Sequence, residues 1–275
     1  MKQKQNKANI IIYSILLVGA LVMIFPFIWS IVTSFKDLSE SLQFPPKFLP
    51  KSWRPVNYAD VWEQLPFVNF FINTVLMILL RVIFATVFSA MAAYAFARMT
   101  FPFKNVLFIL VLMPMMVPSQ IFVLPQYLFA TKIHISNTVM ALVMPGMAST
   151  FGIFLLRQFF MGIPDELEEA AILDGCNPGQ IFIKIMFPLI KPGLVSLAIF
   201  TALFAYKDLL WPLIVNTSIE KMPLSSGLAM LQGQYTTNYP QLMAGAVIAI
   251  IPMVILFLVF QKQFVEGIAT TGSKS

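Results

Sequence analysis

Three ionisable side chains interrupt long apolar runs of this sequence, and they are the first candidates for chemistry: Arg81, Lys207 and Asp208. A charge at the centre of a membrane-spanning helix costs about 2.5 to 3.5 kcal/mol, so such a residue usually faces a cavity or a partner group. Trp211 lies three positions after Asp208, where the two would share a helix face, and an aromatic ring beside a carboxylate suits recognition of a hydroxylated ligand such as a sugar. We therefore take five residues as candidate lining of a polar path for a solute: Tyr206, Lys207, Asp208, Trp211 and Arg81.

A purely structural interpretation of the same residues stays open. Lys207 could extend to the outer membrane interface, Trp211 could lie in the aromatic belt there, and Asp208 could bond a neighbouring helix. Arg81 requires an acceptor, on this chain or on a partner subunit. By the rise per residue of a helix, Arg81 lies about 10 Å deeper in the membrane than Asp208, so a direct pair would require other span boundaries.

Residues for covalent or metal chemistry are scarce. The sequence contains no G-x-x-x-x-G-K-[ST] phosphate loop, so the chain cannot hold ATP in the usual P-loop manner. It has one histidine, His134, and one cysteine, Cys176, which excludes a His-x-x-x-His metal pair and a disulfide within the chain. We expect no enzymatic activity and no cofactor or metal bound by this chain.

A long polar segment, residues 163–191, separates two of the apolar runs. A proline and acidic residues at its start predict a helix, and Gly175 predicts the end of that helix. Asn177 and Pro178 supply an N-cap and a first-position proline for a second helix, which we expect to finish before Pro188. The segment is therefore predicted to be a helix-turn-helix.

Composition places the chain in a membrane, because 59% of its residues are hydrophobic and 11% are charged, against about 25% charged in globular proteins. We predict an all-α, polytopic membrane protein that forms a single domain, 1–275. Its six transmembrane helices are expected at about 10–32, 67–96, 106–129, 138–160, 192–215 and 242–260. The segment 163–191 then joins spans four and five, and a C-terminal tail covers 261–275.

The lysines and arginines are scattered at the ends of the apolar runs, where they orient a membrane protein. More of them fall on the side of the N-terminus than on the other side, so both termini and the segment 163–191 are predicted to be cytoplasmic. The net charge of +6 arises from these positions and does not indicate nucleic-acid binding. The first run, from Ile10, is too long for a signal-peptide core and is expected to be retained as a span.

Prolines interrupt the third, fourth and fifth predicted spans. Pro114, Pro118 and Pro125 interrupt the third, Pro145 the fourth and Pro212 the fifth. Each removes an N–H donor and frees a carbonyl, so we expect broken helices, which membranes tolerate beside other protein or a watery cavity. Broken helices suit a translocation path. Simple bending of each helix is the alternative.

The polar segment also resembles a known motif. Glu169-Ala170-Ala171, followed by Gly175, Ile185 and Pro188, is similar to the cytoplasmic EAA loop of bacterial ABC-importer permeases, with Phe187 where leucine is usual. In that family the loop docks on an ATPase subunit. The resemblance implies that coupling to the ATPase is carried by Glu169, Ala170, Ala171, Asp174 and Gly175.

Further stretches resemble sugar-importer permeases, namely 92–98 (AAYAFAR), 154–160 (FLLRQFF) and 209–214 (LLWPLI), and the ending 264–267 resembles the shorter, maltose-type subunit. The resemblance implies a multi-pass protein of the bacterial inner membrane that forms half of a heterodimeric pore for an oligosaccharide or polyol. Its implied partners are a second permease subunit, two ATPase subunits that hold ATP and Mg²⁺, an extracytoplasmic sugar-binding protein and membrane lipid. The tail 261–275 would reach into the ATPase dimer, with a disordered end as the alternative.

Three other functions remain open at this point. The EAA motif does not name the cargo, so an ABC importer for a non-sugar solute, such as a peptide or phosphate ester, fits the same loop. A secondary transporter driven by an ion gradient could also use broken spans, although intramembrane carboxylates are sparse. A membrane scaffold that transports nothing is the last alternative.

Overall fold

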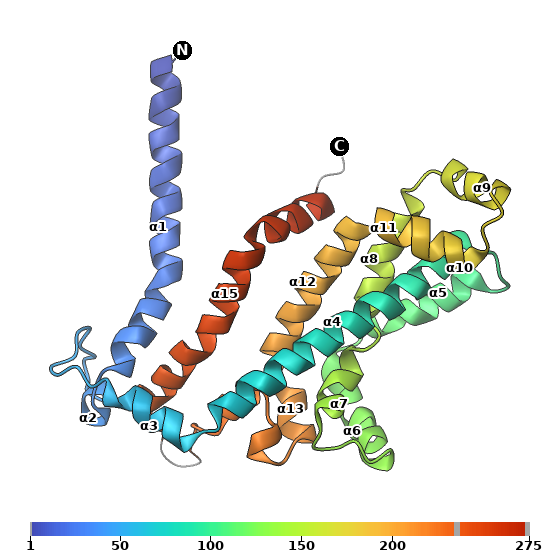
Figure 1. Cartoon of the computed structure of the whole chain (residues 1–275). Coiled ribbons are helices and arrows are strands. Elements are labelled where there is room, and N and C mark those ends of the chain that lie inside the picture. The colour runs from blue at the N-terminus through green and yellow to red at the C-terminus, as the bar shows by residue number, and fades with distance from the viewer. Residues whose placement is uncertain (1, 234–236, 273–275) are drawn as a thin grey trace. The chain divides into compact units, whose positions relative to one another are not determined.

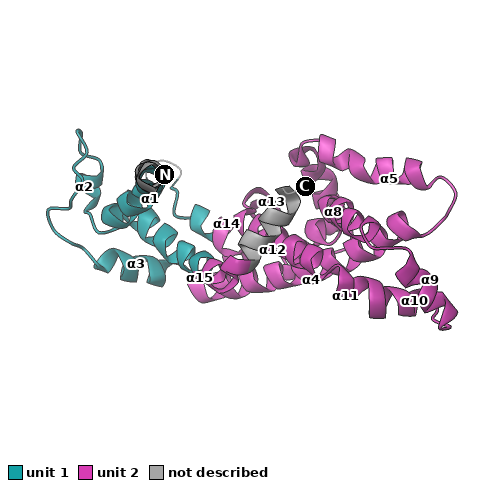
Figure 2. Cartoon of the chain, turned by 90° about the horizontal axis from the view of Figure 1, so that it is seen from above, with its two compact units in different colours: residues 1–66, 227–254 teal, residues 67–226, 255–275 magenta. Residues whose placement is uncertain are grey.

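The computed structural model describes residues 2–233 and 237–272, and all regular secondary structure in these ranges is helical (Figure 1). The chain divides into two compact units (Figure 2). Unit 1 comprises Met1–Pro66 and Gly227–Val254, and unit 2 comprises Phe67–Ser226 and Ile255–Ser275. The all-helical prediction is confirmed for the described ranges, whereas the single domain stays a prediction.

Unit 1 contains the N-terminal helix and the residues that follow it up to Pro66. Asn57 Nδ2 donates to the carbonyls of Ser34 and Lys36 at 2.7 and 2.9 Å, so the end of the first helix is held against the third. Asp37 caps the short second helix, and hydrogen bonds from Ser39, helped by nearby Arg54, lower the pKa of the Asp37 carboxyl. The helices are α1 (Lys2–Ser34), α2 (Leu38–Ser41), α3 (Val56–Gln64) and the first part of α15 (Tyr239–Gly272).

Unit 2 is built around α4 (Phe67–Arg98), which packs along α8 (Thr150–Met161) and α12 (Lys191–Lys207) (Figure 1). The contact is close because small residues face it, as in many membrane helix pairs. A Cβ on Gly152 of α8 would lie 2.7 Å from Ser89 Oγ of α4 and 2.8 Å from Leu197 Cδ2 of α12. Glycine at this position therefore permits the three helices to meet.

Unit 2 also contains the end of α15, from Ile255, and its other elements are short. They are α5 (Lys104–Leu112), η1 (Met113–Met116), η2 (Ser119–Phe122), α6 (Val123–Lys132), α7 (Val139–Val143), η3 (Met144–Gly146), α9 (Glu166–Leu173), α10 (Pro178–Ile181), the π-helical turn η4 (Phe182–Met186), α11 (Phe187–Leu189), α13 (Leu210–Val215) and η5 (Ile219–Lys221). The helix α14 (Leu224–Ala229) crosses the boundary between the units.

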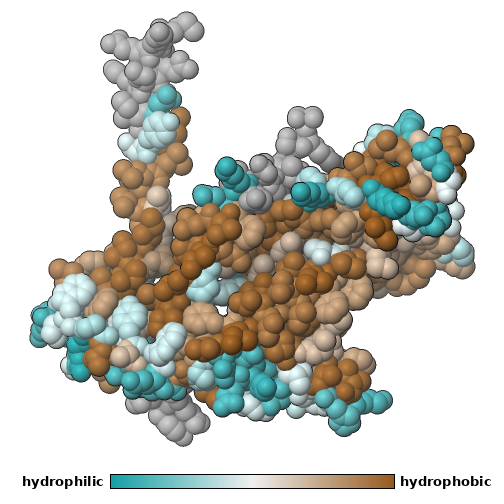
Figure 3. Space-filling model, in the orientation of Figure 1, coloured by the Kyte–Doolittle hydropathy of each residue, from teal (hydrophilic) through white to brown (hydrophobic). Residues whose placement is uncertain are grey.

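Three described helices are long and apolar enough to cross a membrane, namely Ile12–Ser34, Phe67–Arg98 and Tyr239–Lys262. Three bent pairs raise the number to six if each is one span: Lys104–Met116 with Ser119–Lys132 (101°), Val139–Gly146 with Thr150–Met161 (48°), and Pro178–Leu189 with Lys191–Lys207 (74°). Figure 3 shows hydrophobic residues over the long helices of unit 2 and hydrophilic residues where α9 and α10 lie. Broken helices are thus confirmed at the prolines of the third and fourth predicted spans.

The break expected from Pro212 in the fifth predicted span, 192–215, is present, since α12 ends at Lys207 and Asp208 adopts an extended backbone (ψ 112°) before α13 begins. One helix boundary differs from the sequence-based predictions. The second helix of the polar segment does not finish before Pro188. It passes through a wider π-helical turn, Phe182–Met186, and continues to Leu189, because that turn changes the hydrogen-bond register immediately before the proline.

The predicted tail 261–275 is partly described. Helix α15 extends to Gly272, so the backbone of the tail is helical up to that residue. Residues 273–275 lie outside the described residues.

Candidate functional site

The polar segment forms two helices around a tight turn. Helix α9 ends before Gly175, whose φ of 80° is a left-handed conformation that favours glycine. Asn177 Oδ1 then accepts from the N–H of Gln180 at 2.9 Å, and Gln180 Oε1 accepts from the N–H of Asn177 at 3.0 Å. This capping box, with Pro178 in the first turn, begins α10. The predicted helix-turn-helix, its glycine stop and its Asn-Pro start are confirmed.

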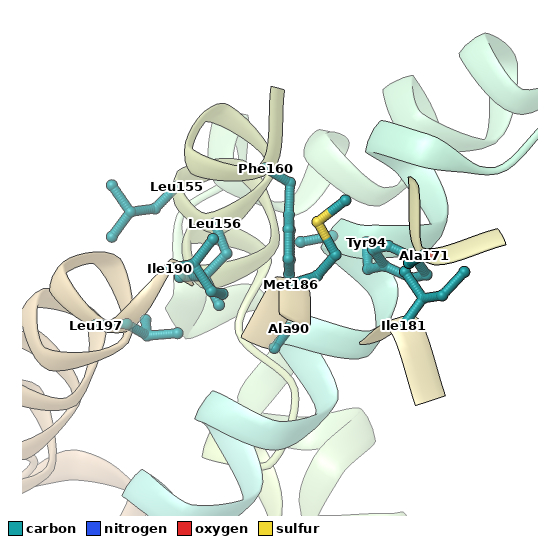
Figure 4. Close-up of a cluster of buried hydrophobic side chains, with 11 residues drawn as sticks. Ala90, Tyr94, Leu155, Leu156, Phe160, Ala171, Ile181, Met186, Ile190 and Leu197 are labelled. Carbon is teal, nitrogen blue, oxygen red and sulfur yellow. The ribbon is translucent and has the colours of Figure 1, made fainter. Parts of the chain in front are cut away.

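The inner side of the segment belongs to the core of unit 2. Ala171 of α9 is 4% exposed and packs in a cluster of buried side chains with Tyr94, Phe160, Ile181 and Met186 (Figure 4). Cys176 in the turn packs against the same cluster as a free thiol. The segment is therefore seated on α4 and α8 through apolar contacts.

The outer side of the segment is exposed. Glu169, Ala170, Asp174 and Gly175 are all exposed, in contrast to Ala171. Leu173, an apolar residue at the end of α9, is 88% exposed. Exposed apolar side chains beside polar ones are typical of a contact surface for another protein. Of the five candidate coupling residues, four face outward and Ala171 holds the helix in place.

A second group of candidate residues lies where two helices are broken by proline. Pro145 lacks the N–H that would bond the carbonyl of Ala141, and the Trp211 ring N–H donates to that carbonyl instead, at 2.9 Å. Pro212 likewise frees the carbonyl of Asp208, which accepts from Ser225 Oγ at 2.6 Å. Each freed carbonyl is thus satisfied by a side chain from another element.

Arg81 of α4 joins these two breaks. Its guanidinium donates to the carbonyl of Leu142, with 2.9 Å from Nε, and its Nη2 lies 2.8 Å from Asp208 Oδ2. A Cβ on Gly146 would lie 2.8 Å from Arg81 Cδ, so only glycine there leaves room for the arginine side chain. We call Arg81, Asp208, Trp211 and the carbonyls of residues 141 and 142 the Arg81 cluster.

The predictions for these residues have mixed outcomes. The requirement for an acceptor on Arg81 is confirmed, and the direct pair with Asp208, which was expected only with other span boundaries, forms where α12 ends at Lys207. Asp208 and Trp211 do not share a helix face, because α12 ends at Lys207, before Asp208, and Trp211 belongs to α13, which begins at Leu210. Trp211 is 4% exposed with its N–H bonded, Lys207 is exposed, and Tyr206 is half-buried.

The sequence-based predictions assigned no site role to Arg98, at the end of α4. It contacts the start of the polar segment through an ion pair with Asp165, and neighbouring Tyr94 bonds Glu168. The sequence placed Arg98 among the basic residues on one side of the membrane, but a partner more than sixty residues later leaves no local signal.

The sequence family described as "Binding-protein-dependent transport system inner membrane component" matches residues 85–269, well over half of the chain. The matched range contains both the polar segment and most of the Arg81 cluster. The chain belongs to this family. The permease is therefore a non-catalytic, multi-pass component of an ABC transporter in the inner membrane, as predicted.

Curated relatives and a solved structure support the assignment. The arabinooligosaccharides transport system permease protein AraQ of Halalkalibacterium halodurans is 35% identical over 258 residues, which cover 93% of the permease and 92% of AraQ. The sn-glycerol-3-phosphate transport system permease protein UgpE of Escherichia coli is 29% identical over 274 residues, covering 96% and 98%. A crystal structure of a bacterial ABC transporter for import of the acidic polysaccharide alginate has the same fold, with a TM-score of 0.78, 23% identity, and coverage of 94% and 97%.

Proposed function

We propose that this permease is one half of a heterodimeric pore in an ABC importer for carbohydrate, an oligosaccharide or a polyol derivative. Relatives that match almost the whole chain are named for arabinooligosaccharides and for sn-glycerol-3-phosphate. Both cargoes carry at least two hydroxyl groups. A hydroxylated solute is thus the common chemistry that these relatives suggest for the permease.

The observation that carries the coupling role is the bare outer face of α9 and its turn. Glu169, Ala170, Asp174 and Gly175 are exposed beside Leu173, while the inner face is packed. A small, partly apolar surface on a capped helix suits docking into a groove of another protein. We assign this surface to an ATPase subunit.

The proposed assembly contains a second permease subunit, two ATPase subunits and an extracytoplasmic sugar-binding protein. The ATPases hold ATP and Mg²⁺, and this chain binds no cofactor. The distribution of lysines and arginines supports six spans with both termini and the segment 163–191 in the cytoplasm. Closure of the ATPases on ATP would then move the docked segment and open the pore outward.

We assign the residues that contact the cargo by their exposure. Lys207 and the part-exposed carboxylate of Asp208 are available for polar contacts with a solute. Arg81 and Trp211 support the path by holding its broken helices, since both are engaged with backbone carbonyls. Tyr206 lies next to Lys207 at the end of α12 and would line the same solute path.

A phosphate ester is the second candidate cargo. It is favoured by the similarity to UgpE and by the exposed cation Lys207 at the end of α12. Lys207→Gln should lower uptake of a phosphate ester more than uptake of a neutral oligosaccharide, because only the ester is anionic. Equal effects on both cargoes would argue against direct contact.

The proposed function is tested by isolating the permease from its native membrane with a tag and identifying co-purifying chains by mass spectrometry. Recovery of an ATPase and a second permease is expected. The complex is then placed in liposomes with its binding protein, and ATP-dependent uptake is measured for arabinooligosaccharide, an unrelated oligosaccharide and sn-glycerol-3-phosphate. Uptake without ATP under an ion gradient would instead indicate a secondary transporter.

A further inference from the structure

Arg98 is the last residue of α4, yet its side chain is only 8% exposed. Its Nη2 donates to the carbonyl of Phe160 at 2.8 Å and to the carbonyl of Ile163, and its Nη1 pairs with the carboxylate of Asp165. Phe160 lies in the last turn of α8, where carbonyls lack intrahelical donors. One guanidinium thus joins the end of α4 to the end of α8 and to the residue that precedes α9.

Tyr94 adds a second contact from the same face of α4, one turn earlier. Its hydroxyl donates to Glu168 Oε1 at 2.8 Å, and the tyrosine ring is buried against Phe160 and Phe182. Glu168 is therefore turned inward, whereas the next residue, Glu169, is exposed. Helix α9 is attached to α4 at two successive turns through charged hydrogen bonds.

One N–H donor of Arg98 has no hydrogen-bond partner. Its Nε is buried, makes no hydrogen bond and lies 3.9 Å from Glu168 Oε2. A hydrogen bond of this kind forms at about 2.9 Å. A shift of α9 toward α4 by about 1 Å would therefore bring Nε and the Glu168 carboxylate together and tighten the attachment.

Helix α4 is suited to carry a displacement along its length. It contains neither proline nor glycine, whereas the other two uninterrupted spans contain Pro26 and Pro252 and the remaining candidate spans are bent pairs. Arg81 lies on the same helix about 26 Å before Arg98 by the rise per residue. One unbroken helix thus connects the attachment of α9 with the Arg81 cluster at the broken spans.

We propose that Arg98, assisted by Tyr94, is the positioning residue through which movement of the segment 163–191 reaches the membrane spans, with α4 carrying that movement to the Arg81 cluster. This inference rests on the proposed docking of the segment on an ATPase subunit. The bare outer face of α9 receives the ATPase, and the inner contacts of Asp165 and Glu168 pass the displacement on. Loss of Arg98 should therefore separate ATP hydrolysis from transport.

The test uses the complete importer in liposomes, with binding protein and cargo, and measures uptake per ATP hydrolysed. Arg98→Ala is expected to keep ATP hydrolysis and to lower uptake per ATP about tenfold or more, since several charged hydrogen bonds are lost. Arg98→Lys should restore part of the ratio, because an ammonium reaches fewer of the acceptors. Tyr94→Phe, which removes one hydroxyl and keeps the ring, should lower the ratio about two- to tenfold.

Arg157→Ala is the matched control. Arg157 caps the same end of α4, donating from Nε to the carbonyl of Phe96 at 3.1 Å and lying over the Phe108 ring, and none of these contacts involves α9. Its uptake per ATP should stay at the wild-type value. A normal ratio in Arg98→Ala, or an equal loss in Arg157→Ala, overturns the proposal. If the importer with Arg98→Ala fails to assemble, Tyr94→Phe becomes the test. An unchanged uptake per ATP in that variant also overturns the proposal.

A distance measurement separates this inference from the proposed function. Spin labels at Ile172 and Met99, both exposed, are introduced in a Cys176→Ser background and report the distance between α9 and the end of α4. The distribution should be narrow with and without ATP, and Arg98→Ala should broaden it even in the isolated permease. A broad wild-type distribution refutes the attachment. If the wild-type distribution is narrow but the complex shows no ATP-dependent uptake, the proposed importer function is refuted and the attachment of α9 to α4 stands.

Discussion

Removing the charge of Arg81 tests whether the Arg81 cluster holds the broken spans together. In Arg81→Met, the Asp208 carboxylate loses its cation and the carbonyl of Leu142 loses its side-chain donor. Breaking a buried ion pair by removing one partner costs about 3 to 5 kcal/mol. The lower end, about 3 kcal/mol, applies here because the Asp208 side chain is 22% exposed and can be partly solvated.

Thermal unfolding of the purified permease in mild detergent measures this loss. For a chain of this size about 3 kcal/mol corresponds to a fall in melting temperature of roughly 5 to 10 °C. The amount of protein inserted in the membrane should stay near the wild-type level, while uptake by the assembled importer falls. Insertion and function are thus expected to respond differently to this change.

A double variant supplies the control. Arg81→Met with Asp208→Asn leaves no unpaired charge, so it should be more stable than Arg81→Met alone, although the carbonyl of Leu142 still lacks the arginine donor. The reasoning is refuted if Arg81→Met melts at the wild-type temperature. It is also refuted if the double variant is less stable than the single one.

The remaining predictions concern the breaks and the docking surface. Trp211→Phe should cost about 1 to 3 kcal/mol in the same melting assay, because the buried carbonyl of Ala141 loses its donor. Gly146→Ala should cost a similar amount, because the new methyl group would displace Arg81. Gly175→Pro should prevent ATPase binding in co-purification, because proline cannot adopt a φ of 80°, whereas Gly175→Asn should retain binding. Glu169→Lys should lower ATP-dependent uptake at normal expression, and an equal loss in the exposed control Glu220→Lys would contradict a specific docking role.

Local signals in the sequence were sufficient for the helix-turn-helix and for the broken spans. Gly175, Asn177 and Pro178 act on their immediate neighbours, so their turn and cap could be predicted from residue type. Pro145 could be expected to free a carbonyl for the same reason. The donor that replaces the missing N–H is Trp211, seventy residues after Ala141, whose carbonyl it bonds, and no local rule selects it.

The differences from the sequence-based expectations arise where the backbone departs from an ideal helix. A direct pair of Arg81 and Asp208 was expected only with other span boundaries, and the pair forms where α12 ends at Lys207 and Asp208 is extended. At Pro188 a wider turn accommodated a proline that was expected to end the helix. Residue types alone do not specify where such a wider turn forms.

At the proline breaks, the carbonyls of residues 141 and 208 are hydrogen-bonded by side chains, and this constrains how the sequences of related permeases can diverge. A relative that replaces Pro145 regains an N–H for the carbonyl at position 141, so its residue at position 211 no longer has to be a hydrogen-bond donor. The same reasoning links position 212 with position 225. Substitutions within each of these pairs should therefore occur together across the family, and the order of acquisition is constrained, because the donor must be present before the proline is tolerated.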